Sequence, residues 1–111
     1  MRRGDLWIAA AGSGYLGKPR PVLILQDDRF SETGSVTVCP LTTNPTPAPL
    51  FRIELVPGSD NGLQERSRLM VDKITTVSRE RLDKKIGFLD DATLLAVNRA
   101  VIVFLGIAQF R

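Results

Sequence analysis

Short apolar runs separated by turn-forming residues make up most of the chain. Asp5–Ala10 and Pro21–Gln26 are apolar, and the second is rich in branched residues, as buried strands are. Ser35–Leu41 has the same character. Phe51–Leu55 alternates apolar and charged residues, which is typical of a strand with one face in water. We therefore predict strands at these four places.

Further along the chain the apolar runs become shorter. Arg68–Val71 and Lys73–Val77 predict one or two more strands, and Ile86–Leu89 a small one. The charged segment Arg79–Lys85 predicts a helical turn or a loop. Glycine, proline and polar residues predict loops or turns at Ala11–Pro19, Asp27–Gly34, Pro45–Pro49 and Pro57–Gly62.

An amphipathic helix closes the chain. Asp90 or Asp91 is suited to cap its first turn, and Gly106 is suited to end it. Leu94, Val97, Val101 and Leu105 recur at helical spacing and form the expected buried stripe. Five or more short strands with one terminal helix favour a mainly β fold built on a small, strongly curved sheet or partial barrel. The 111 residues fit a single domain, 1–111.

Composition limits the chemistry that the chain can carry. It contains no histidine and one cysteine, Cys39, which we expect to be a buried core residue rather than a nucleophile or a metal ligand. No metal and no cofactor are therefore expected. No signal peptide or membrane-spanning run is visible, so we expect a cytoplasmic protein without a membrane partner. The net charge of +3 permits a polyanionic partner without requiring one.

Arg20 and Thr42 are the candidate catalytic residues. Arg20 opens one predicted strand and Thr42 closes another, so both lie at a sheet rim. An arginine fork and a threonine hydroxyl suit a phosphate, and RNA supplies its own nucleophile in the 2′-hydroxyl. The alternative for Arg20 is a surface arginine before a strand, and for Thr42 a strand end that leads into a turn.

Seven other residues are candidates for RNA binding. Tyr15 lies among glycines, where it is free to stack on a base, and Arg68 and Lys73 suit either a phosphate contact or a solvated surface. The complete set is Ser13, Tyr15, Lys18, Thr43, Asn44, Arg68 and Lys73.

Five motifs in order along the chain resemble the MazF/PemK family of toxin endoribonucleases. They are Arg3-Gly4-Asp5-Leu6-Trp7, Lys18-Pro19-Arg20-Pro21, Pro40-Leu41-Thr42-Thr43-Asn44, Val71-Asp72-Lys73-Ile74, and the segment from Arg81 through Leu89 into the final helix. The resemblance implies an SH3-like small barrel with a long C-terminal helix, assembled as a homodimer. It also implies metal-independent, sequence-selective cleavage of single-stranded RNA to 2′,3′-cyclic phosphate and 5′-hydroxyl ends, and a cognate antitoxin protein as partner.

The same resemblance gives Arg20 proton transfer and phosphate stabilisation, and gives Thr42 transition-state stabilisation. The chain departs from the family in the loop after the first strand, where Gly12-Ser13 is followed by Gly14-Tyr15 without a glutamate. Lys73 stands where the family often has glutamine, which favours phosphate over base contact. Apolar residues on the final helix and around Val36–Cys39 exceed the needs of one small core, which also suggests a dimer. Two rivals share the fold: a gyrase-poison toxin, and a barrel that binds RNA without cutting it.

Overall fold

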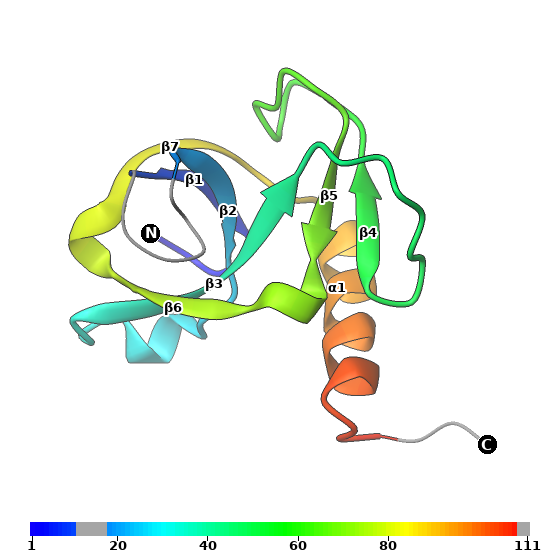
Figure 1. Ribbon diagram of the computed structural model, residues 1–111. Coiled ribbons are helices and arrows are strands. Elements are labelled where there is room, and N and C mark those ends of the chain that lie inside the picture. Colours follow the sequence, from blue (N-terminus) through cyan, green and yellow to red (C-terminus); the bar gives the residue numbers. More distant parts are fainter. Residues whose placement is uncertain (11–17, 109–111) are drawn as a thin grey trace.

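The computed structural model describes residues 1–10 and 18–108, which form a seven-stranded antiparallel sheet and a C-terminal helix (Figure 1). The strands are β1 (Asp5–Ala9), β2 (Arg20–Ile24), β3 (Ser35–Thr42), β4 (Arg52–Leu55), β5 (Ser67–Met70), β6 (Thr75–Ser78) and β7 (Leu82–Phe88). In the described part of the chain, the 3-10 turns η2 (Asp28–Phe30), η3 (Val71–Lys73) and η4 (Arg79–Arg81) precede the helix α1 (Asp91–Phe104). The expected mainly β fold with a long terminal helix is confirmed.

The sheet curves because the two ends of the long strand β3 pair with different strands. The strand order is β4-β5-β3-β2-β1-β7, and β6 pairs with β3 off this path. Ser35–Val38 of β3 pair with β6, whereas Leu41 and Thr42 of the same strand pair with β5. The chain leaves β5 through η3 before it returns as β6, so the sheet wraps round as a partial barrel (Figure 1). Within the described ranges the strand pairings do not close the barrel.

Apolar side chains are buried on both faces of the sheet. Along β2, Val22 and Ile24 face a cluster inside the curve, while Leu23 faces a second cluster that includes Val97 of α1. This is why β2 is a continuous apolar run rather than an alternating one. Val36, Val38 and Cys39 are also fully buried within the chain. The idea that the Val36–Cys39 strand carries surplus apolar surface for a dimer is therefore wrong.

The helix α1 follows its predicted signals at both ends. The Asp90 carboxylate accepts a hydrogen bond from the Thr93 N–H at 2.8 Å, and Gly106 adopts φ of 70° just after the helix. Val97 is buried, and Leu94 and Val101 are half-buried. Leu105 was expected in the buried stripe, but it is 59% exposed because the end of the helix projects beyond the sheet (Figure 1).

Two other expectations about local structure are wrong. Lys73 lies in the 3-10 turn η3 and not on a strand. Of the charged segment Arg79–Lys85, only Arg79–Arg81 forms a turn, and Asp83, Lys84 and Lys85 are exposed residues of β7. β7 pairs with β1 and ends the strand path, so its outward side chains can be charged without cost to the core.

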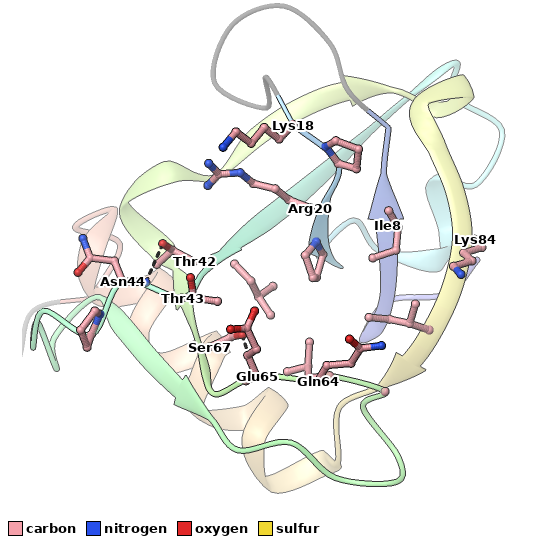
Figure 2. A pocket seen from close by; sticks show the side chains of 17 residues that line it. Ile8, Lys18, Arg20, Thr42, Thr43, Asn44, Gln64, Glu65, Ser67 and Lys84 are labelled. Carbon is pink, nitrogen blue, oxygen red and sulfur yellow. Dashed lines mark hydrogen bonds between the residues drawn. The ribbon is translucent and has the colours of Figure 1, made fainter.

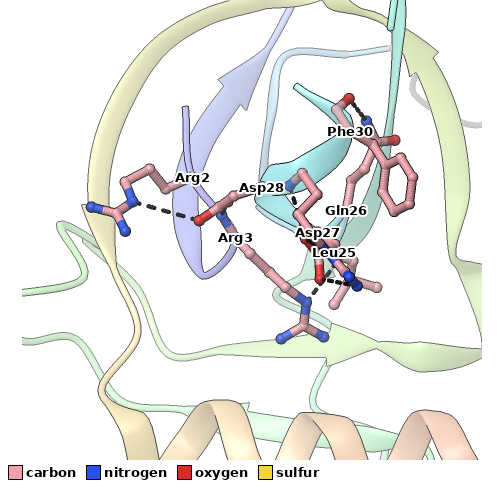
Figure 3. Close-up of polar contacts among 8 residues, drawn as sticks. Arg2, Arg3, Leu25, Gln26, Asp27, Asp28 and Phe30 are labelled. Atoms are coloured by element: carbon pink, nitrogen blue, oxygen red, sulfur yellow. Dashed lines mark hydrogen bonds and ion pairs between the residues drawn. The ribbon is translucent and has the colours of Figure 1, made fainter. Parts of the chain in front are cut away.

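Hydrogen bonds from the Arg3-Gly4-Asp5 segment anchor the N-terminus to the rest of the fold. The Arg3 guanidinium donates to the Leu25 carbonyl and to Asn98 Oδ1 of α1, each at 2.7 Å. Asp28 accepts from the Arg3 N–H and pairs with Arg2 (Figure 3). The motif is therefore structural.

In the part of the chain that the structure describes, no helix has the length and apolar character needed to span a bilayer.

Candidate functional site

A groove of about 870 Å³ opens where β2 begins and β3 ends (Figure 2). Lys18 and Arg20 lie on one side of it, and Gln64 and Glu65 lie on the other. Apolar side chains form the remaining lining, together with small polar groups. The further lining residues are Ile8, Pro19, Pro21, Leu41, Thr42, Thr43, Asn44, Pro45, Gly62, Leu63, Ser67, Lys84 and Ile86.

Strand pairing positions Arg20 and Thr42. The pairing of β2 with β3 ends at Val22 and Pro40, and Arg20 and Thr42 each lie two residues beyond that pair, where both line the groove. Both side chains are half-buried. Among the described residues, no hydrogen bond or ion pair engages the Arg20 guanidinium. Its fork of donors is thus available to an anion in the groove.

A short hydrogen-bonded turn fixes the segment after β3. The Thr42 hydroxyl oxygen accepts from the Asn44 N–H at 3.2 Å, and Asn44 Oδ1 accepts from the Thr46 N–H at 3.0 Å. Because the Thr42 hydroxyl acts as an acceptor in this turn, its own proton remains available for donation into the groove.

The charge lining the groove is mainly positive. Lys18, Arg20 and Lys84 contribute cations, and Glu65 contributes the single carboxylate among the described lining residues. An arginine fork, a hydroxyl donor and two lysines suit a phosphodiester better than a cationic or apolar ligand.

The structure brings together five of the predicted residues, and leaves four outside the groove lining or outside the described ranges. Lys18, Arg20, Thr42, Thr43 and Asn44 line the groove. Lys73 is exposed on η3, away from that lining. Ser13 and Tyr15 lie outside the described residues.

Arg68 lies opposite Thr42 on β5, but its side chain is engaged elsewhere. Its guanidinium donates to Glu54 at 2.9 Å and to the Asn44 carbonyl at 3.1 Å, and the side chain is 15% exposed. This arrangement makes Arg68 a support for the turn after β3.

Gln64, Glu65, Ser67 and Lys84 line the groove without having been singled out from the sequence. The Pro57–Gly62 turn was recognised, but the residues after it carried no distinctive pattern. Lys84 belonged to a segment expected to be a turn or loop, although it lies on β7. Only the folding of the β4–β5 connection against β3 and β7 brings these side chains to the groove.

Metal-ligating groups do not gather in the resolved parts of the fold: no three His, Cys, Asp or Glu side chains there could hold a metal ion. Cys39 is buried beside Pro40, and burial raises the pKa of its thiol to about 12 because the thiolate would lose its hydration. Cys39 therefore belongs to the core, as its apolar neighbours predict.

Comparison with known proteins gives a consistent set of matches. Residues 2–105 match the family described as PemK-like, MazF-like toxin of type II toxin-antitoxin system. A Mycolicibacterium smegmatis protein named probable endoribonuclease MazF is 55% identical over 108 residues, covering 97% of this chain and 99% of the relative. Endoribonuclease EndoA of Bacillus subtilis is 31% identical, covering 99% of this chain and 98% of the relative.

Solved structures are similar over the same length. A mycobacterial endoribonuclease in complex with its cognate antitoxin superposes with a TM-score of 0.79 at 26% identity, covering 99% of each chain. The Mycobacterium tuberculosis toxin MazF-mt6 gives a TM-score of 0.80 at 26% identity, covering 95% of this chain and 99% of that one.

Proposed function

The chain belongs to the PemK-like, MazF-like toxins of type II toxin–antitoxin systems, and from this premise we propose that it is a metal-independent endoribonuclease that cuts single-stranded RNA at selected sequences. The observation that carries the proposal is the placement of Arg20 and Thr42 together in the lining of a mainly cationic groove. The relatives named as endoribonucleases support it.

The reaction uses the substrate's own nucleophile. The 2′-hydroxyl oxygen passes its proton to water and attacks the adjacent phosphorus, the bond from phosphorus to the 5′-oxygen breaks, and the 5′-oxygen takes a proton from Arg20, which regains one from water. The products are a 2′,3′-cyclic phosphate and a 5′-hydroxyl. Arg20 holds the phosphoryl oxygens with its fork of donors, and we assign proton delivery to the same residue. Thr42 donates its hydroxyl proton to the charge that develops on the phosphoryl group.

Lys18, Thr43 and Asn44 complete the proposed RNA contacts within the groove. Lys18 is exposed beside Arg20, where its ammonium can pair with a neighbouring phosphate (Figure 2). Thr43 and Asn44 lie on the exposed turn after β3, where hydroxyl and amide groups can reach the RNA backbone or a base. Ser13, Tyr15, Arg68 and Lys73 stay predictions from the sequence.

Two protein partners belong to the proposal. The cognate antitoxin places an acidic segment in the groove, because a site built for phosphates also attracts carboxylates. A second copy of the chain covers the apolar end of α1, where Leu105 and Ile107 are 59% and 71% exposed. The toxin domain spans 1–111 and acts on RNA in the cytoplasm.

The test is to incubate purified protein with a long single-stranded RNA in excess EDTA and to map the new ends. Discrete cuts that carry cyclic phosphate termini are expected, and the Arg20→Ala protein should leave the RNA intact. If the folded wild-type protein leaves the RNA intact, the nuclease assignment is wrong, and a gyrase inhibition assay then tests the gyrase-poison alternative.

A further inference from the structure

Opposite the cations of the groove lies a carboxylate that phosphate chemistry does not require. We propose that Glu65 is a specificity-determining residue, which accepts a hydrogen bond from the exocyclic amino group of one base of the bound RNA. The inference rests on the proposed nuclease function and extends it to base selection.

Glu65 lies across the groove from the phosphate-binding side. In Figure 2, Lys18 and Arg20 occupy one side, and Gln64 and Glu65 occupy the other. A carboxylate repels phosphate oxygens, whereas Lys18 and Arg20 attract them. Lys84, the third cation of the lining, lies apart from both on β7. A strand in the groove therefore turns its phosphates toward Lys18 and Arg20, and its base edges toward Glu65.

The connection that carries Glu65 is fixed at both ends. On one side Leu63 is buried in the core beneath α1, and its N–H donates to Asn61 Oδ1 at 3.0 Å. On the other side Ser67 is buried, and its hydroxyl donates to the Glu65 carbonyl at 3.0 Å.

Glycines let this connection pack tightly against β7. A Cβ at Gly62, whose φ is 68°, would collide with the Ile86 carbonyl oxygen. A Cβ at Gly87 would collide with the backbone of Asp60 and Asn61. The resulting backbone is preorganised, which is what selection between bases requires.

Within residues 1–10 and 18–108, no cation forms an ion pair with the Glu65 carboxylate. Its neighbour Arg66 pairs instead with Glu54 at 3.4 Å, as does Arg68 at 2.9 Å. Among the residues that the structure describes, neither the Glu65 carboxylate nor the Gln64 side-chain amide makes a hydrogen bond or ion pair. Both are exposed on the wall of the groove, so they are free to meet a ligand.

An ionised carboxylate can only accept hydrogen bonds, and this determines which bases it favours. Adenine, cytosine and guanine each carry an exocyclic amino group, and carboxylates are known acceptors for the amino group of cytosine. Uracil carries no amino group, and its one ring donor on that edge, N3–H, lies between two carbonyl oxygens that a carboxylate repels. We therefore expect one position of the cleavage motif to exclude uracil through Glu65.

The experiment is a double-mutant cycle, in which the Glu65 carboxylate is removed from the protein and the amino group is removed from the RNA, separately and together. A randomised single-stranded RNA pool first gives the motif cut by the wild-type, Glu65→Ala and Glu65→Gln proteins. Short oligonucleotides with that motif are then made with each amino-bearing base replaced in turn by its counterpart without the amino group: pyrimidin-2-one for cytosine, hypoxanthine for guanine, purine for adenine. Glu80→Gln is the matched control, because it removes the same charge from an exposed residue outside the groove.

At one position, loss of the amino group should slow wild-type cleavage about 10-fold or more, and should have little effect on Glu65→Ala, since a hydrogen bond to a charged group is worth about that factor. The motif of Glu65→Ala should then admit uracil there, while Glu80→Gln keeps the wild-type motif. Thermal melting checks that each variant is folded.

Three results would overturn the inference. Equal effects of amino-group removal in wild-type and Glu65→Ala proteins would show that Glu65 does not select the base. An equal fall in rate at every site of the pool would instead make Glu65 a proton acceptor in the reaction. Intact RNA with the wild-type protein would remove the proposed nuclease function, and this inference with it, whereas the first two results leave that function standing.

Discussion

Arg20 and Thr42 both line the groove from neighbouring strands, each two residues beyond Val22 and Pro40, the pair at which the pairing of β2 with β3 ends. The relationship depends on the sheet backbone. Val22 and Pro40 are fully buried, so a shift of one residue would move side chains to the opposite face of the sheet and disrupt their packing. The pair is therefore held in place before any substrate binds.

Replacement of Arg20 by alanine should abolish most of the cleavage without harming the fold. We expect a rate about 100- to 1,000-fold lower, as found when a donor to developing charge is removed from other active sites. The free energy of unfolding should stay within about 0.5 kcal/mol of wild type, since no described residue forms a hydrogen bond or ion pair with the guanidinium. Antitoxin binding should persist. Arg20→Lys serves as the control that keeps the charge but loses the fork, and an alanine variant that cuts RNA at the wild-type rate would refute the assignment.

Thr42→Val should slow cleavage by about 10- to 100-fold, because valine keeps the shape of threonine and removes the hydroxyl donor. Thr42→Ser should recover most of the activity. The measurement is the single-turnover rate on an oligonucleotide that carries the wild-type motif. Thr76→Val on β6, outside the groove lining, is the matched control and should cut normally. Equal rates for both valine variants would remove Thr42 from the mechanism.

The ion pair between Arg52 and Asp72 should make stability depend on pH. The Arg52 guanidinium donates to both Asp72 carboxylate oxygens, at 2.8 Å and 3.0 Å, and this hydrogen bonding holds the pKa of Asp72 below its usual value. Because the pKa of Asp72 is lower in the folded than in the unfolded protein, the ionised carboxylate stabilises the fold at pH values above its unfolded pKa of about 4. This contribution disappears as pH falls through the pKa of the folded protein.

Asp72→Asn should therefore lower the free energy of unfolding by about 1–3 kcal/mol at pH 7, since both side chains of the pair are only 17% exposed. The difference in free energy of unfolding between Asp72→Asn and wild type should become smaller below about pH 4. Urea unfolding at several pH values measures it. Asp83→Asn, at an exposed position of β7, should show no comparable loss. If this difference in free energy of unfolding stays constant with pH, the ion pair is not its source.

Cys39 should be inert toward thiol reagents in the folded protein. The residue is fully buried, and the pKa of its thiol is raised to about 12, so almost no thiolate exists at pH 8. A colourimetric disulfide reagent should label it only after urea is added. Rapid labelling of the native protein would show that the core around Cys39 opens readily.

The projecting end of α1 should be the apolar part of the dimer contact. Leu105 and Ile107 are exposed there, so Leu105→Ser with Ile107→Ser should shift the protein toward monomer without lowering its melting temperature as a monomer. Multi-angle light scattering at micromolar concentration is the measurement. Phe30→Ser, at an exposed apolar residue of η2 away from the end of α1 (Figure 1), is the control. A wild-type protein that is monomeric under these conditions would refute the dimer.

Local signals in the sequence were sufficient for much of the fold. The apolar runs gave β1, β2 and β3 within two residues, because burial on both faces of the sheet leaves a continuous apolar pattern. Asp90 and Gly106 marked the ends of α1, because capping and left-handed backbone depend on single residues. Arg20 and Thr42 could be predicted to lie together at the rim of the sheet, because the start of one strand and the end of the other are recognisable in the sequence.

Only the tertiary structure decided which other residues reach the groove. Arg68 suited either a phosphate contact or a solvated surface, yet its paired neighbour on β4 is Glu54, which engages it. Gln64 and Glu65 looked like ordinary loop residues, yet the packing of Gly62 against Ile86 turns their connection toward the groove. Such contacts join residues far apart in the chain, and no local pattern of hydrophobic and polar positions encodes them.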